Sequence, residues 1–217
     1  MSSLKEATKL KTEIGVDKKD RIANILFKID AVKFGVYKLS TGKASPYYID
    51  LRVIPSFPDA FREICDLYAQ YITQEIGLKK FDRIAGIPLA GLPFASQIAY
   101  NLKKPFLYIR KGIKLQGRER RVEGILVSGD RVLLIDDLLT TGVTLKNAAD
   151  AVRAEGGVVT DAVVFLDREE GGKQLVEKNG VKLHPLVKIS EVATDLYELG
   201  AIDQESLKTI QKQIKKQ

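Results

Sequence analysis

The chain has 217 residues, 45% of them hydrophobic and 29% charged, which is an ordinary balance for a globular protein and excludes collagen-like, low-complexity and disordered chains. The 35 lysines and arginines outnumber the 28 aspartates and glutamates, so the formal net charge is +7. No apolar run approaches the roughly 20 residues that span a bilayer, and the single cysteine excludes an internal disulfide. We therefore expect a cytoplasmic protein that does not bind membranes, with one domain over residues 1–217 in which 1–16 form an N-terminal extension.

The first quarter of the chain predicts a helix, a hairpin and a second helix. Apolar residues recur at helical spacing over residues 17–32, which predicts the first helix. Glycines at positions 35 and 42 then mark a short hairpin, and the hairpin is followed by the β-rich run 47–51. The second helix follows Pro58, because the apolar residues after it share one helical face.

From residue 81 onward, strand-like segments alternate with helical ones. The strands are near-continuous apolar runs, as expected for parallel strands that are buried on both faces. They cover residues 81–87, 105–110, 131–136, 158–166 and 181–187. The C-terminal segment 190–215 predicts one or two helices. This alternation predicts an α/β fold, in which a central, mostly parallel sheet is flanked by helices.

The positive charge is concentrated between Lys103 and Arg121. Eight basic residues oppose one acid there, Glu119, and 8 − 1 = +7 equals the formal excess of the whole chain. A nucleic-acid-binding protein would spread its charge over a face and interleave aromatic residues, so we expect no nucleic-acid partner. Glycines and a weak apolar pattern in segment 111–124 leave two interpretations, a solvated loop or a mobile loop that closes over a polyanion.

The most informative segment is 132–144, in which an apolar strand ends in two adjacent acids and a Thr/Gly-rich turn then opens a helix. Ligands of open α/β sheets bind beyond the carboxyl ends of the strands, where Asp136 and Asp137 fall. The turn 140–144 offers backbone N–H groups, hydroxyls and the positive end of a helix dipole, which together suit a phosphate. The carboxylates of the two acids would repel a phosphate, but they can accept hydrogen bonds from the hydroxyls of a sugar. The competing interpretation, a helix N-cap beside a solvated acid, leaves the turn unexplained.

This segment resembles the phosphoribosyl-diphosphate signature of the type I phosphoribosyltransferases. Three more segments are similar to the orotate phosphoribosyltransferases in particular: the hairpin 33–48, the loop 110–124 and the run Leu166–Gly172. The resemblance implies the type I phosphoribosyltransferase fold, with a small N-terminal hairpin or hood and a mobile catalytic loop. It is strongest to the orotate domain of bifunctional UMP synthase, although 217 residues leave no room for a decarboxylase barrel.

The resemblance also implies a reaction and a set of site residues. The reaction would transfer 5-phosphoribosyl from phosphoribosyl diphosphate (PRPP) to orotate, giving orotidine 5'-monophosphate and diphosphate in de novo pyrimidine synthesis. The catalytic residues would be Lys114, Asp136 and Asp137. The residues that would bind PRPP are Arg110, Lys111, Lys114, Asp136, Asp137, Leu138, Leu139, Thr140, Thr141, Gly142, Val143 and Thr144. Orotate would contact Thr140 and Arg168, with Tyr48 and Tyr47 as candidate aromatic partners.

The same resemblance implies Mg²⁺ as a cofactor and a homodimer with shared active sites. Mg²⁺ would be held mainly through substrate oxygens and water, so no metal-ligating residues are expected in the chain. Three departures from the family pattern stand out. Ser40 stands where a lysine is common, with Lys38 as a possible substitute. Leu115-Gln116 replaces an acid followed by His or Tyr, and Gly112 replaces an acid.

Two alternative functions stay open at this point. The first is a phosphoribosyltransferase that acts on another base, for example a purine. The second is a non-catalytic, nucleotide-sensing regulator on the same fold, which would normally carry an added DNA-binding module. A base-specificity assay would distinguish the first alternative from an orotate enzyme.

Overall fold

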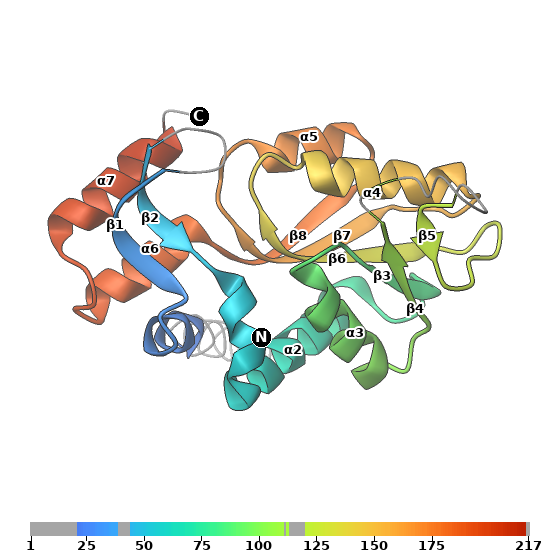
Figure 1. Ribbon diagram of the computed structural model, residues 1–217, viewed down its shortest axis with the longest axis horizontal. Coiled ribbons are helices and arrows are strands. Elements are labelled where there is room, and N and C mark those ends of the chain that lie inside the picture. Colours follow the sequence, from blue (N-terminus) through green and yellow to red (C-terminus); the bar gives the residue numbers. More distant parts are fainter. Residues whose placement is uncertain (1–20, 39–43, 111, 113–119, 216–217) are drawn as a thin grey trace, which may run out of the picture. The chain divides into compact units, whose positions relative to one another are not determined.

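The computed structural model describes residues 21–38, 44–110, 112 and 120–215, which form two compact units (Figure 1). Of the described residues, the smaller unit contains 21–38, 44–53 and 189–215. The larger unit spans Ile54–Lys188. This division does not test the prediction of one domain over residues 1–217, because two compact units can belong to one domain.

The larger unit is built around a six-stranded sheet with the strand order β5-β4-β3-β6-β7-β8. Its strands are β3 (Arg83–Gly86), β4 (Phe106–Ile109), β5 (Val122–Glu123), β6 (Val132–Leu139), β7 (Asp161–Asp167) and β8 (Lys182–Lys188). Neighbouring strands are parallel, except that the edge strand β5 pairs with β4 in the antiparallel direction. The prediction of a mostly parallel sheet is therefore confirmed.

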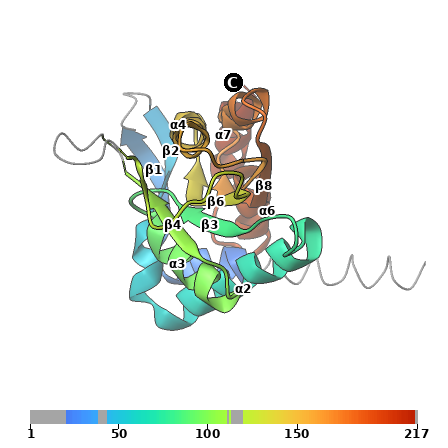
Figure 2. The ribbon, with the colours of Figure 1, turned by 90° about the vertical axis from the view of Figure 1, so that its right-hand side faces the viewer.

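Helices cover both faces of this sheet. The helices α2 (Pro58–Tyr71) and α3 (Gly91–Asn101) lie along one face, and α4 (Val143–Ala154) and α5 (Gly172–Lys178) lie along the other (Figures 1 and 2). A short π-helical turn, Ile72–Ile76, continues α2. The apolar runs that predicted the strands form the core, because side chains on both faces of β6 and β7 are buried under these helices.

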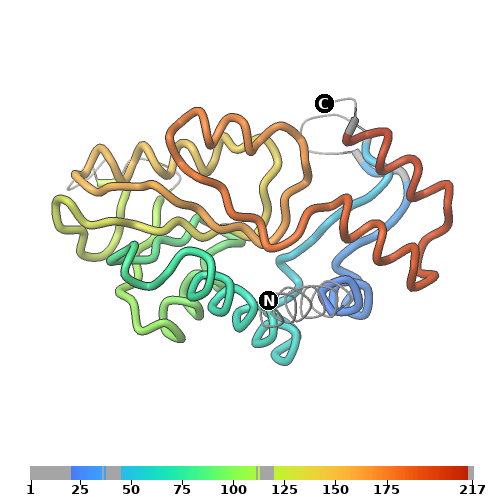
Figure 3. Tube along the Cα trace, turned by 180° about the vertical axis from the view of Figure 1, so that it is seen from behind, coloured from blue at the N-terminus to red at the C-terminus, as the bar shows by residue number. Residues whose placement is uncertain are grey.

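The smaller unit combines the two ends of the described chain. A helix over residues 21–28 precedes the antiparallel hairpin of β1 (Val32–Lys38) and β2 (Ala44–Ile49). The C-terminal helices are α6 (Ile189–Glu198) and α7 (Gln204–Lys215), and α7 packs beside β2 (Figure 3). A 3-10 helix, Leu51–Ser56, follows the hairpin. The hairpin and the two C-terminal helices agree with the sequence prediction.

The first helix is shorter at its C-terminal end than the sequence predicts. It was expected to continue to residue 32, but the helical residues end at 28, and Val32 already pairs with Ile49 in the hairpin. The reason is local, because Asp30 adopts a left-handed conformation with φ +56, which a helix does not contain. The expected helix start at 17–20 lies outside the described residues.

The segment expected to be a loop over residues 111–124 ends in a strand. Lys111 and residues 113–119 lie outside the described residues. Val122 is buried against the core, and its backbone N–H donates to Glu155 Oε1 at 3.0 Å, as the N–H of Arg121 does at 2.8 Å. The prediction of a loop through residue 124 was therefore wrong at β5. Val122 is a single apolar residue among charged ones, which is too weak a pattern to predict a strand.

None of the helices in the described parts of the chain is both long enough and apolar enough to span a membrane.

Candidate active site

The acid pair lies inside β6 rather than after its end. The sequence predicted a strand to residue 136, but β6 continues to Leu139. Asp136 is buried, and Asp137 is partly exposed. The Oδ1 atom of Asp136 accepts a hydrogen bond from the backbone N–H of Asp137 at 3.0 Å. The two acids are therefore coupled to each other, and the buried one is held by the backbone of its neighbour.

Gly91 permits Asp136 to lie against the start of α3, a contact that no sequence motif indicated. A Cβ atom at Gly91 would stand 2.7 Å from Asp136 Oδ1 and 3.0 Å from Asp136 Cα, closer than real contacts allow. The absence of a side chain at Gly91 therefore brings the carboxylate to the N-terminal end of a helix, which favours a negative charge. The only available signal was a glycine at a helix start, and many glycines occupy such positions without a functional role.

The turn that follows the acids has the form expected of an anion site. Gly142 caps α4 in a left-handed conformation with φ +77, and its carbonyl accepts the N–H of Lys146 at 2.9 Å. Within the described residues, no side chain caps this helix start. Thr141, Val143 and Thr144 are exposed. The first backbone N–H groups of a helix have no partner within the helix, so an anion can bind them at this exposed turn.

Arg168 lies next to the start of this turn. It directly follows β7, and its backbone N–H donates to the carbonyl of Leu139 at 3.0 Å. Its Nε donates to Glu170 Oε1 at 2.8 Å, and the two side chains are only 5% and 8% exposed. Burial raises the pKa of the neighbouring Asp167, whose Oδ1 accepts the N–H of Glu169 at 2.8 Å. The fold thus brings Arg168 to the strand end that carries the acids and holds it there by an ion pair.

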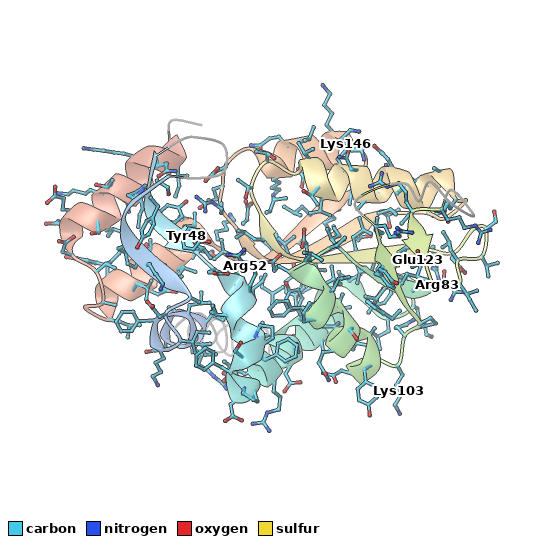
Figure 4. The ribbon with its side chains drawn as sticks, viewed as in Figure 1. Tyr48, Arg52, Arg83, Lys103, Glu123 and Lys146 are labelled. Carbon is cyan, nitrogen blue, oxygen red and sulfur yellow. The ribbon has the colours of Figure 1, made fainter. Side chains whose placement is uncertain are left out.

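Arg110 and the turn share a cavity of about 240 Å³. Arg110 follows β4, and its N–H donates to the carbonyl of Arg121 at 2.8 Å. Its Nη1 contacts Oε1 of Glu123 at 3.3 Å. Figure 4 labels Glu123. Arg121 and Thr144 line the same cavity. On the sequence alone, Arg121 counted only as part of the basic cluster and had no assigned role. Lys111 and Lys114 were predicted to act beside Arg110, and both lie outside the described residues.

The two candidate aromatic residues belong to the smaller unit and differ in burial. Tyr47 is fully buried, so of the two only Tyr48 offers part of its ring to a ligand. The ring of Tyr48 lies 5.6 Å from that of Tyr37, and its hydroxyl accepts Arg52 Nη2 at 2.8 Å (Figure 4). Arg52 in turn forms a two-point ion pair with Asp50, with distances of 2.6 and 2.9 Å. No sequence pattern indicated this contact of Tyr48.

Comparisons with known proteins identify the family. Residues 56–198 match the phosphoribosyl transferase domain. The chain is 42% identical over 192 residues to an orotate phosphoribosyltransferase of Cenarchaeum symbiosum, and the match covers 88% of this chain and 96% of the relative. The chain belongs to the orotate phosphoribosyltransferase family.

Solved structures agree with this assignment to the orotate phosphoribosyltransferases. UMP synthase of Leishmania donovani superposes with a TM-score of 0.81 at 32% identity, covering 91% of this chain and 42% of that one. Orotate phosphoribosyltransferase from Aeropyrum pernix superposes with a TM-score of 0.70, also at 32% identity, covering 82% of this chain and 99% of that one. The predicted family and fold are therefore confirmed, and neither alternative function is favoured. The roles of individual residues stay predictions.

The donor set of this orotate phosphoribosyltransferase is compatible with a magnesium ion bound mainly by substrate. In the ranges that the structure describes, no three His, Cys, Asp or Glu side chains gather closely enough to hold a metal ion. The adjacent carboxylates of Asp136 and Asp137 are hard oxygen donors of the kind Mg²⁺ prefers. Mg²⁺ commonly takes one or two carboxylates and completes its shell with phosphate oxygens and water, so these residues fit the ion.

Gly142→Ala is expected to lower kcat/KM for PRPP by about tenfold or more in this orotate phosphoribosyltransferase. The left-handed φ costs about 1–2 kcal/mol for an alanine. In addition, the new Cβ would stand 2.5 Å from the backbone oxygen of Gly172, which would displace the turn. Gly129→Ala is the matched control, because Gly129 has φ +88 but a Cβ added there would meet no atom within 4 Å. Both variants carry the backbone strain, but only Gly142→Ala displaces the turn, so steady-state kinetics and thermal unfolding of both variants separate the two effects. Equal kinetics in the two variants would contradict the expectation.

Proposed function

We propose that this chain transfers the 5-phosphoribosyl group of PRPP to the N1 atom of orotate, which gives orotidine 5'-monophosphate and diphosphate. The observation that carries the proposal is the continuous run 136–144, where two carboxylates near the end of β6 are followed by an exposed turn and a helix start that no side chain caps within the described chain. Arg168 is hydrogen-bonded to this run at Leu139. These groups match a ligand that combines a phosphate, a ribose and a carboxylated base.

The turn 140–144 would bind the 5-phosphate, and the acid pair would bind the ribose. Backbone N–H groups at the start of α4 and the threonine hydroxyls can donate to phosphate oxygens. Asp136 and Asp137 can accept hydrogen bonds from the two ribose hydroxyls. The transition state develops positive charge on the ribose ring, and carboxylates fixed nearby stabilise that charge more than they stabilise the neutral substrate.

Cationic groups would bind the leaving diphosphate. Arg110 can make two parallel hydrogen bonds to phosphate oxygens, and Lys111 and Lys114 are the further cations that the family pattern supplies. Mg²⁺, held by the substrate and by water, would neutralise part of the charge on the diphosphate. Arg121, which lines the cavity beside Arg110, adds a positive charge to the same region.

Arg168 would bind the carboxylate of orotate. Its ion pair with Glu170 holds the guanidinium in one orientation, which lowers the entropy lost when a planar carboxylate binds. Tyr48 would contribute a ring face to the pyrimidine.

We also propose a homodimer in which Lys114 acts in the site of the neighbouring subunit. The mass of the protein in solution tests whether the protein is a dimer.

The test is consumption of orotate, followed by its ultraviolet absorbance, in the presence of PRPP and Mg²⁺. Absorbance should fall only when PRPP is present, and diphosphate should form in equal amount. Parallel reactions with uracil, adenine and hypoxanthine measure the base preference. No orotate consumption, or faster reaction with one of the other bases, would overturn the proposal.

A further inference from the structure

A buried tyrosine on α2 contacts the backbone beneath the acid pair. Tyr68 is fully buried, and its hydroxyl donates to the carbonyl oxygen of Asp136 at 2.6 Å. Its ring lies 6.2 Å from the ring of Phe94 on α3 and 6.2 Å from that of Phe165 on β7. The hydroxyl is therefore held at one place by ring packing on two sides, and 68 residues of chain separate it from its partner.

The contact falls on the peptide unit that joins the two acids. Asp136 pairs with Val164 and Leu138 with Leu166, so β6 and β7 keep one register on either side of Asp137. The N–H of the same peptide unit, on Asp137, donates to Asp136 Oδ1 at 3.0 Å. The peptide unit between the acids is therefore held at its carbonyl by the Tyr68 hydroxyl and at its N–H by a carboxylate oxygen.

The orientation of this peptide unit affects the direction of both acidic side chains. In a strand, successive side chains point to opposite faces of the sheet, so a rotation of the peptide between two adjacent acids turns both carboxylates. The directions of Asp136 and Asp137 therefore depend on the peptide unit that the Tyr68 hydroxyl holds.

The Tyr68 hydroxyl keeps its proton in this buried position beside the two acids. Burial raises the pKa of Tyr68 well above its ordinary value, and the negative charges of Asp137 and Asp136 raise it further. Tyr68 is therefore a neutral hydrogen-bond donor at neutral pH.

We propose that Tyr68 is a positioning residue, whose hydroxyl fixes the peptide unit between Asp136 and Asp137 and so directs both side chains toward the ribose of PRPP. This inference rests on the proposed function of the acid pair. Tyr68 does not touch the substrate and acts only through the backbone of the acids.

The test is Tyr68→Phe, which removes one hydroxyl and keeps the ring that packs on Phe94 and Phe165. We expect kcat/KM for PRPP to fall about tenfold, which corresponds to about 1.4 kcal/mol, with the KM for orotate unchanged within twofold. The matched control is Tyr71→Phe, because Tyr71 lies one turn further along α2 and its hydroxyl contacts His184 Nδ1 at 3.4 Å, away from the acids. That control should keep wild-type kinetics.

A double-mutant cycle with Asp137→Asn separates positioning from general damage. If Tyr68 acts through the acids, its removal should have little further effect once Asp137 is neutral, so the two losses should not multiply. Multiplying losses, unchanged kinetics in Tyr68→Phe, or a Tyr68→Phe chain that is unfolded when Tyr71→Phe is folded would each overturn the proposal. An inactive wild-type chain would instead refute the proposed function, so the two failures are distinguishable.

Discussion

Asp137→Asn is expected to lower kcat by roughly 10²-fold or more while the fold stays intact. Asparagine keeps the size of the side chain and one accepting oxygen, but it removes the negative charge that would stabilise the ribosyl cation. Asp137 is partly exposed, so its replacement leaves no cavity. Because the charge matters most in the transition state, kcat should fall more than the affinity for PRPP.

The control for Asp137→Asn is Asp150→Asn on the exposed side of α4. Asp150 pairs with Lys146 at 2.6 Å. Its replacement by asparagine also removes one negative charge, in the same unit of the protein. Steady-state kinetics of both variants, with circular dichroism to verify the fold, measures the difference. If kcat is unchanged in Asp137→Asn, this acid has no part in the mechanism.

Arg168→Ala is expected to raise the KM for orotate by roughly 10²-fold and to change the KM for PRPP far less. The lost contact is a charge-assisted hydrogen-bond pair to the carboxylate of the base, for which a loss of about 1.5–3 kcal/mol is typical. Such a loss raises the KM for orotate by a factor of about 10 to 10². The Arg168 side chain is only 5% exposed, and charge interactions are stronger away from water, so we expect the upper end of this range.

The single substitution has a second effect that must be separated from the first. It leaves Glu170, which is 8% exposed, without its cationic partner, and breaking a buried pair in this way destabilises by roughly 3–5 kcal/mol. The double variant Arg168→Ala, Glu170→Gln removes that charge. We expect it to recover most of the thermal stability and to keep the high KM for orotate. If the KM for orotate recovers together with stability, or if the KM for PRPP rises equally, Arg168 supports the scaffold and does not bind the base.

Much of the fold could be predicted because its signals are local. Strands β6 and β7 are continuous apolar runs, and such runs indicate strands that are buried on both faces wherever they lie in a sheet. The acid pair and the turn 140–144 were found for the same reason, since nine consecutive residues carry both. Boundaries were less accurate: β6 continues three residues beyond the prediction, and Asp30 ends the first helix early.

What the sequence alone determined about this protein is its fold class and its family, together with a prediction for the chemistry of one contiguous motif, because residue spacing and motif order are written along the chain. Tertiary structure alone decided which distant residues support that motif. Gly91 lies against Asp136, Gly172 lies against the turn at Gly142, and the Tyr68 hydroxyl contacts the Asp136 carbonyl. Each contact joins segments whose separation is set by strand order and by the packing of helices on the sheet. Sequence spacing carries no such information, since a glycine or a tyrosine on an apolar helix face looks the same whether or not an active site lies beside it.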